Sequence, residues 1–348
     1  MDVVTTSAPG KAFLFGEHAV VHGEPALAIA ISTRSFITMQ KRADSKVNIL
    51  AKDLSIRNLQ VSYGERGVEF DTDYSSVQDA LAFVRLPMQA AFADAGKEIG
   101  LDITTTSDLL AGTGLGSSAS ISVATALAAS EMMNLGWDNN KIFEVCRETK
   151  FKVERGAASA TDISLATFGG VCLYRKSNKG DTTEKIENAP PLPLVIGYSG
   201  TAGKSEEMVR HVMRLREKYP EEVSEIIRAI GRISLRGAKA VAENNLAEVG
   251  ELMNINQGLL DALGVNTLKL SELIYAARQA RALGAKISGA GGGKCMICLA
   301  PEQELVKSAI EMYGGTPIVT SISKDGARVE KHKTSIEISE ESKKVLGV

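Results

Sequence analysis

The chain has 348 residues, of which 44% are hydrophobic and 24% charged, and its formal net charge is -2 at pH 7. This composition predicts a folded chain with a large core, in two domains or in one large domain, and excludes a disordered protein. The near-neutral charge excludes a general attraction for nucleic acid, and no 18-residue apolar run or signal-peptide pattern occurs, so we expect a cytoplasmic protein without a membrane partner.

The first forty residues predict strands that surround a loop with histidines. Short apolar strands are expected at three places, residues 12–15, 26–31 and 36–39. Pro9-Gly10 indicates a turn before the first of them. The loop over residues 16–23 contains Glu17 and two of the four histidines in the chain, His18 and His22.

The next elements lead into a glycine-rich loop. We expect an edge hairpin region over residues 44–73, a helix over 77–95 and a strand over 101–105. Residues 111–120 read AGTGLGSSAS and precede a run of helix formers that ends near Met133. Glycines before a helix N-terminus favour binding of a phosphate group, because unpaired N–H groups and the helix dipole face it.

The spacing of these glycines matches neither a Walker A motif nor a dinucleotide fingerprint. The alternative interpretation is an ordinary loop in which Ser117 or Ser118 caps the helix.

A second helix is expected over residues 139–153, and small residues then surround one acidic residue, Asp162. Asp162 begins or caps a short helix that ends near Gly169, and helix capping alone would explain its presence. A strand over 170–174 follows. Residues 177–193 are polar and contain three prolines, which predicts a domain boundary, with domains over residues 1–189 and 190–348.

The second half alternates strands and helices. Expected elements are a strand over 194–198, two helices of which the second begins near Pro220, a helix end over 254–266, a helix over 271–283, a glycine-rich loop over 286–293, a buried strand over 294–299, a helix over 303–313 and a strand over 317–321. The charged tail from about residue 323 is expected to be loose, apart from a short strand over 327–329. The four cysteines form no disulfide framework, and the pair Cys295 and Cys298 lacks the further ligands of a zinc site.

Three motifs occur in this order along the chain: APGKAFLFGEHAVVHG, GTGLGSSAS and KISGAGGGKC. Together they resemble the GHMP kinases, the family named for galactokinase, homoserine kinase, mevalonate kinase and phosphomevalonate kinase. The resemblance extends to about Val329. GEHAVVHG and MNINQGLLDALGVN are most similar to family members that phosphorylate mevalonate, and the second stretch resembles the archaeal and bacterial ones. The resemblance implies a mixed α/β (α+β) fold, with an N-terminal ribosomal-S5-like domain, a C-terminal ferredoxin-like domain and the site between them.

The resemblance also implies transfer of the γ-phosphoryl group of ATP to the 5-hydroxyl of mevalonate, with Mg²⁺ bound to the phosphates. The residues expected to surround the nucleotide are Gly112, Thr113, Gly114, Leu115, Gly116, Ser117 and Ser118. Ser118, rather than Ser117, is the implied metal ligand. Asp162 is the implied general base and Lys11 its cationic neighbour. The residues implied in mevalonate binding are Glu17, His18, Gly289 and Ala290. We expect His22 to be structural.

Two positions depart from the family pattern. The family usually has a magnesium-binding glutamate eleven residues before the catalytic aspartate, where this chain has Phe151, with Lys150 one residue earlier. Glu154 is the favoured substitute for this ligand, and Glu148 is the alternative. The interpretation that Glu154 is a solvated glutamate that binds no metal is equally well supported. The other departure is Lys204-Ser205, where relatives often have Ser-Thr.

Two other functions stay open at this point. One is another GHMP kinase, such as phosphomevalonate kinase, and the other is a catalytically weak sensor of ATP and a metabolite. The sequence is also compatible with a homodimer.

Overall fold

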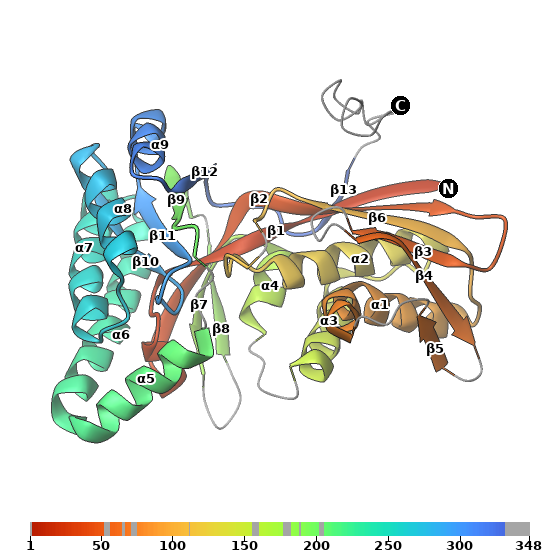
Figure 1. The fold of residues 1–348 in the computed structure, drawn as a ribbon, viewed down its shortest axis with the longest axis horizontal. Coiled ribbons are helices and arrows are strands. Elements are labelled where there is room, and N and C mark those ends of the chain that lie inside the picture. Colours follow the sequence, from red (N-terminus) through yellow and green to blue (C-terminus); the bar gives the residue numbers. More distant parts are fainter. Residues whose placement is uncertain are drawn as a thin grey trace.

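The computed structural model describes residues 2–51, 56–64, 67–70, 75–110, 112–154, 160–176, 182–187, 189–201 and 205–330. Figure 1 shows two parts side by side: a long sheet with helices α1–α4 along it, and a smaller sheet surrounded by helices α5–α9. The two longest strands, β1 (Val3–Phe15) and β2 (Pro25–Lys41), run from the first part into the second. A short 3-10 helix, η1 (Ala19–His22), lies between these strands.

The strands expected over residues 12–15, 26–31 and 36–39 are confirmed as parts of β1 and β2. The predicted turn at Pro9-Gly10 is wrong, because β1 continues through it and stays paired with β2. Pro9 pairs with Arg34 and Gly10 with Ile31, so an irregularity in the register takes up the bend. Gly10 instead permits close packing, since a Cβ there would lie 2.8 Å from the carbonyl oxygen of Leu115.

The larger sheet has the strand order β13-β1-β2-β6-β3-β4-β5, with β7 beside another part of β2 and β8 beside β7. Its other strands are β3 (Val47–Ala51), β4 (Ile56–Gly64), β5 (Gly67–Phe70), β6 (Leu101–Ser107), β7 (Val171–Arg175), β8 (Thr182–Ile186) and β13 (Arg328–Val329). The antiparallel ladders of β3, β4 and β5 confirm the predicted edge region. Exposed residues of β8 explain why its polar sequence looked like a linker.

The helices of this part confirm the predicted ones. They are α1 (Ser75–Ala95), α2 (Ser117–Met133), α3 (Asn139–Val153) and α4 (Thr161–Phe168). Helix α2 contacts β1 and β2 on one side and the other three helices on the other. Its many alanines and serines permit this burial on all sides, because small side chains let neighbouring elements approach closely.

The smaller sheet has the antiparallel order β10-β11-β9-β12. Its elements are β9 (Leu194–Tyr198), α5 (Ser205–Lys218), α6 (Pro220–Ala242), α7 (Leu246–Ala262), α8 (Leu268–Gln279), β10 (Gly284–Ser288), β11 (Cys295–Leu299), α9 (Gln303–Met312) and β12 (Thr316–Thr320). Counting the helices between β9 and β10 as one layer, this is the βαββαβ pattern of a ferredoxin-like domain, which confirms the expected fold class.

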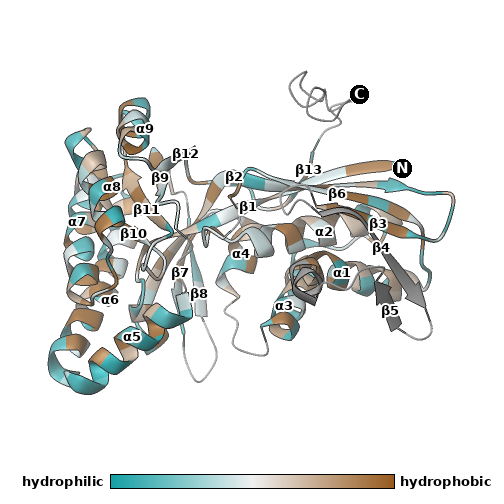
Figure 2. Cartoon of the chain, viewed as in Figure 1, coloured by the Kyte–Doolittle hydropathy of each residue, from teal (hydrophilic) through white to brown (hydrophobic). Residues whose placement is uncertain are grey.

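Helices α5–α9 carry hydrophilic and hydrophobic residues together, as Figure 2 shows. In α6, Val223, Ile227 and Ile230 are buried at helical spacing. One hydrophobic cluster joins both parts, because Leu14 of β1 packs in the same cluster as Ile196 of β9. The predicted domain division at residues 189/190 falls between β8 and β9 and stays a prediction.

The chain returns to the first sheet after β12. The short strand expected over 327–329 is confirmed as β13, whereas the prediction of a loose tail is wrong for the other residues from 323 to 330. Strand β13 pairs with Thr6 and Ser7 of β1. Arg34, only 5% exposed, donates to the carbonyl oxygens of Asp325 and Gly326 at 3.4 and 2.6 Å. Burial lowers the pKa of Arg34 to about 10. The rest of the tail, residues 331–348, lies outside the described part.

The four cysteines are buried and free, and Cys295 and Cys298 lie in the buried strand expected for them. Across the part of the chain that the structure describes, no helix combines the length and the apolar character needed to cross a bilayer.

Candidate active site

The glycine loop before α2 is shaped by left-handed backbone at alternate residues. Gly112, Gly114 and Gly116 have φ angles of 76°, 79° and 79°. The loop is fastened to β1, where the N–H of Lys11 donates to the carbonyl oxygen of Leu115 at 2.8 Å. A Cβ on Gly116 would lie 2.8 Å from Cγ of Lys11, so this contact requires glycine. Leu115 is buried in the core and anchors the loop.

The N-terminus of α2 has no side-chain cap. Gly116 is the N-cap residue, so capping by Ser117 or Ser118 is contradicted. A neighbouring hydroxyl, that of Ser120, is within 2.7 Å of the Ser35 hydroxyl and holds the helix on β2. The first N–H groups of a 17-residue helix are therefore not capped by a side chain, which suits binding of an anion.

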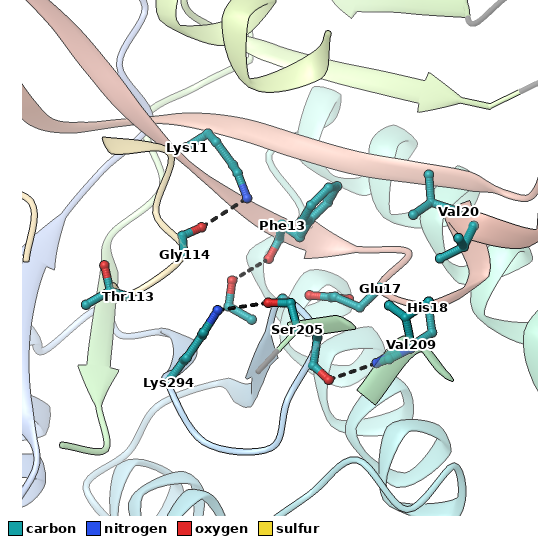
Figure 3. A pocket seen from close by; sticks show the side chains of 14 residues that line it. Lys11, Phe13, Glu17, His18, Val20, Thr113, Gly114, Ser205, Val209 and Lys294 are labelled. Atoms are coloured by element: carbon teal, nitrogen blue, oxygen red, sulfur yellow. Dashed lines mark hydrogen bonds between the residues drawn. The ribbon is translucent and has the colours of Figure 1, made fainter. Parts of the chain in front are cut away.

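A cavity of about 240 Å³ lies beside this loop, between the two parts of the chain. Figure 3 shows side chains that converge on it from β1, the glycine loop, α5 and the loop after β10. The predicted site residues that line it are Lys11, Glu17, His18, Thr113, Gly114, Gly289 and Ala290. Residues 17–18, 113–114 and 289–290, distant in the sequence, therefore meet at one cavity.

Lys11 extends from β1 to the glycine loop, and its Nζ donates to the carbonyl oxygen of Gly114 at 3.1 Å (Figure 3). Burial lowers the pKa of the Lys11 ammonium. The carboxylates of Asp162 and Glu17 oppose this shift, and the charges of Lys150 and Lys294 add to it. Asp162 thus lies within electrostatic range of Lys11, as expected, although it does not line the cavity itself.

Asp162 forms an ion pair that the sequence did not predict. Its Oδ2 accepts from Nζ of Lys150, and its Oδ1 accepts from the N–H of Ile163 at 2.9 Å. The Lys150 ammonium also lies 3.9 Å from a carboxylate oxygen of Glu154. The side chain of Lys150 is only 8% exposed, so this lysine is unusually buried.

The two glutamates considered as metal ligands differ in their surroundings. Glu154 ends α3 beside Lys150, and burial raises its pKa, with Lys150 opposing and Asp162 adding to the shift. Glu148 is exposed on α3. Phe151, at the position of the family's glutamate, is 59% exposed.

Lys294 is a second lysine that lines the cavity, after Lys11, and the sequence motifs did not single it out. Its φ of 61° is left-handed, and its Nζ donates to the Ser205 hydroxyl at 2.8 Å (Figure 3). Its Cδ lies beside the glycine loop, 3.8 Å from the position that a Cβ on Gly114 would take. The lysine that ends GAGGGK was the available signal. Ser205 supplies the hydroxyl expected near this position, whereas Lys204 lies outside the described residues.

Glu17 lines the cavity, but its carboxylate is engaged in a buried ion pair with Lys286. Both side chains are almost fully buried, and Asn256 donates to the other carboxylate oxygen at 3.4 Å. Burial lowers the pKa of Lys286, and the charge of Glu17 opposes this. The sequence gave no sign of this partner, because Lys286 comes from β10, 269 residues later.

His18 lies at the other end of the cavity in a left-handed conformation, with φ of 61°. Its Nε2 is 2.9 Å from the carbonyl oxygen of Ala290, and its buried Nδ1 has no hydrogen-bond partner within the described part of the chain. Burial lowers the pKa of His18, which favours the neutral ring. His22 instead contacts Arg216 at 2.9 Å and does not line the cavity, consistent with the structural role expected for it.

Comparison with known proteins places these features in one family. The family description "GHMP kinases N terminal domain" matches residues 81–170, and "GHMP kinases C terminal" matches residues 238–315. The chain is 41% identical to the mevalonate kinase of Pyrococcus furiosus, over 94% of this chain and 98% of that protein.

Two solved structures share the fold. The Methanococcus jannaschii mevalonate kinase is 26% identical, with a TM-score of 0.76 over 92% of this chain and 98% of that one. The L. major mevalonate kinase, solved in complex with R-mevalonate, has a TM-score of 0.74 at 22% identity, over 91% of this chain and 95% of that one.

Proposed function

Because the chain belongs to the GHMP kinase family, we propose that it transfers the γ-phosphoryl group of ATP to the 5-hydroxyl of mevalonate. The products are 5-phosphomevalonate and ADP. One observation carries the proposal: the uncapped N-terminus of α2, Lys11 and the cavity beside His18 meet at the same place. The relatives named mevalonate kinase support the choice of acceptor.

The triphosphate binds on the glycine loop, residues 112–118. Backbone N–H groups of the loop and of the first turn of α2 supply hydrogen bonds, and the helix dipole favours the negative charge. Lys11 and Lys294, which flank Gly114, add two positive charges. Phosphoryl transfer depends mainly on positioning and charge neutralisation, and these groups provide both.

Mevalonate occupies the cavity with its 5-hydroxyl toward Lys11. Glu17, His18, Gly289 and Ala290 line this space. The ion pair of Glu17 with Lys286 fixes the wall of the cavity.

Asp162 accepts the proton of the 5-hydroxyl as the reaction proceeds. The hydroxyl oxygen forms a bond to the γ-phosphorus, and the bond from that phosphorus to the bridging oxygen of ADP breaks. Lys11 stabilises negative charge that develops on the hydroxyl oxygen. Lys11 and Asp162 interact electrostatically, which supports this pairing.

The donor set fits a Mg²⁺ ion that is held mainly by the nucleotide. Within the described ranges, no group of three His, Cys, Asp or Glu side chains could hold a metal ion alone. Mg²⁺ usually takes one or two protein ligands with phosphate oxygens and water. Ser118, in the first turn of α2, and Glu154, beside Lys150, would supply them. Bound there, Mg²⁺ would neutralise charge on the phosphates.

ADP release with and without mevalonate tests the function. We expect release that depends on mevalonate and exceeds that with equal concentrations of phosphomevalonate, homoserine or galactose. Preference for a phosphorylated acceptor would instead identify a phosphomevalonate kinase. ATP binding without turnover on any of these would identify a sensor. The homodimer and the cytoplasmic location remain predictions, which sedimentation and cell fractionation test.

A further inference from the structure

Lys150 carries a positive charge in a place where charges are costly. Its side chain is 8% exposed, on the last turn of α3, and its ammonium contacts a carboxylate oxygen of Asp162. Removing an ammonium group from water is unfavourable unless a counter-charge lies close by. The lysine and the aspartate therefore depend on each other for their burial.

Both oxygens of Asp162 are held by this arrangement. Oδ2 accepts from Lys150, and Oδ1 accepts from the N–H of Ile163 at 2.9 Å. A carboxylate with one partner can rotate about its last bond, whereas one with partners on both oxygens has a fixed plane. The Ile163 bond is local to α4, so the contact from α3 is the one that tertiary packing supplies.

A second carboxylate restrains Lys150 itself. Glu154 lies 3.9 Å from the ammonium and ends the same helix, four residues later. Lys11 Nζ donates to the carbonyl oxygen of Gly114 and acts on Asp162 through its charge, and among the described residues the structure shows no hydrogen bond between Lys11 and Asp162. The direct bond to the aspartate thus comes from Lys150 and not from Lys11.

We infer that Lys150 is a positioning residue for phosphoryl transfer, which holds the Asp162 carboxylate in the orientation that receives the substrate proton. This inference rests on the proposed function, because it assigns Asp162 to the acceptor hydroxyl. Misplacement of a reacting group by about 1 Å can cost roughly 10²-fold in rate. A lysine that served only stability would leave the rate per folded molecule unchanged.

Three variants of the full chain separate these roles. Lys150→Met keeps the length of the side chain and removes its charge, and we expect kcat to fall by about 30- to 100-fold while KM for ATP changes little. Lys150→Arg restores the charge and should regain at least about tenfold of that loss. Lys152→Met is the matched control, because Lys152 is exposed on the same helix, and we expect it to behave like the parent.

A Lys150→Met variant with the kcat of the parent would overturn the inference. So would a Lys150→Arg variant as slow as Lys150→Met while its Tm equals that of the parent, since an intact cation would then bring no benefit. Both results leave the proposed function standing, because the parent still turns over mevalonate.

Thermal unfolding without substrate tests the role of Lys150 separately from the proposed phosphorylation of mevalonate. Lys150→Met and Asp162→Asn should each lower Tm, and the double variant should lower it by less than their sum, because each single change leaves a buried group without its partner. If the parent releases no ADP with mevalonate, the proposed function fails. An additive Tm effect in the double variant overturns the inference about Lys150.

Discussion

In the proposed reaction, the phosphate side of the site is main chain, residues 112–118, whereas the acceptor side consists of the side chains of Lys11 and Asp162, with Lys150 bound to Asp162. On the phosphate side, three left-handed glycines and a helix N-terminus provide the N–H groups. On the acceptor side, the three residues come from β1, α3 and α4. A backbone site depends on which residues have no side chain, and a side-chain site depends on how distant elements pack.

This difference predicts how each side responds to mutation. Changes on the acceptor side should lower kcat with binding retained, because those groups act on the reacting atoms. Changes on the phosphate side should mainly raise KM for ATP, because those groups hold the nucleotide in both ground and transition states.

The largest effect is expected on the acceptor side. Asp162→Asn keeps the shape of the side chain but cannot accept the proton, so kcat should fall by roughly 10²-fold or more. Binding of ATP and mevalonate, measured by calorimetry, should persist. Near-normal turnover in this variant would remove Asp162 from the chemistry.

A smaller effect is expected for Gly116→Ala. The new Cβ would lie 2.8 Å from Cγ of Lys11 at a φ of 79°, so the loop must move away from β1. We expect KM for ATP to rise by about 10- to 30-fold, in line with the cost of a left-handed residue plus a clash. Gly112→Ala is the control, since its φ of 76° carries similar strain, but no atom of the described residues, apart from its chain neighbours, lies within 4 Å of the added Cβ. Equal effects of the two variants would mean that backbone strain, and not the contact with Lys11, matters.

Lys294→Met should have an effect smaller than that of Gly116→Ala, and it should appear in ATP binding, as expected for a residue on the phosphate side. The variant loses one positive charge at the cavity, and we expect KM for ATP to rise by about fivefold to tenfold with a smaller change in kcat. Lys324→Met removes a lysine outside the cavity and serves as the control for net charge. A Lys294 variant that loses kcat but keeps its KM would move Lys294 to the acceptor side.

The smallest effect is expected for Glu154→Gln. If Glu154 completes the magnesium shell, the variant should need about threefold more free Mg²⁺ for half-maximal rate, because Ser118, the phosphates and water remain as ligands. Glu148→Gln should titrate like the parent, since Glu148 is exposed on α3. Binding of Mn²⁺ with ATP, followed by electron paramagnetic resonance, gives a second reading that does not depend on turnover. Identical metal curves for both variants would exclude Glu154 as a ligand.

The same contrast decides what the sequence could predict. The glycine loop could be predicted from the sequence, because glycines spaced just before a helix indicate the backbone conformation of the loop directly. Apolar periodicity predicted most of the strands and helices, but not the polar strand β8, the packing of residues 323–326 or the continuous strand at Pro9-Gly10. There, pairing with β2 along the rest of β1 outweighed the local preference of two residues for a turn.

Only some residues of the acceptor side could be predicted from the sequence. Asp162 and Lys11 could be selected through their motifs, but the partner of Asp162 could not. Lys150 looks like any lysine on a charged helix, and only the packing of α3 against α4 buries it. The pairing of Glu17 with Lys286 was equally hidden, because it joins β10 to the loop after β1.

The return of the chain to its first strand bears on the order in which the protein can be assembled during synthesis. Thr6 and Ser7 leave the ribosome more than three hundred residues before their partners in β13 are made. Until then the outer edge of β1 is open and the Arg34 guanidinium lacks the carbonyl oxygens of Asp325 and Gly326. A nascent chain therefore carries an unfinished sheet edge until β13 is made, and unfinished edges recruit other strands. Ribosome-bound chains that stop at residue 322 should accordingly engage chaperones more strongly than chains extended past residue 330.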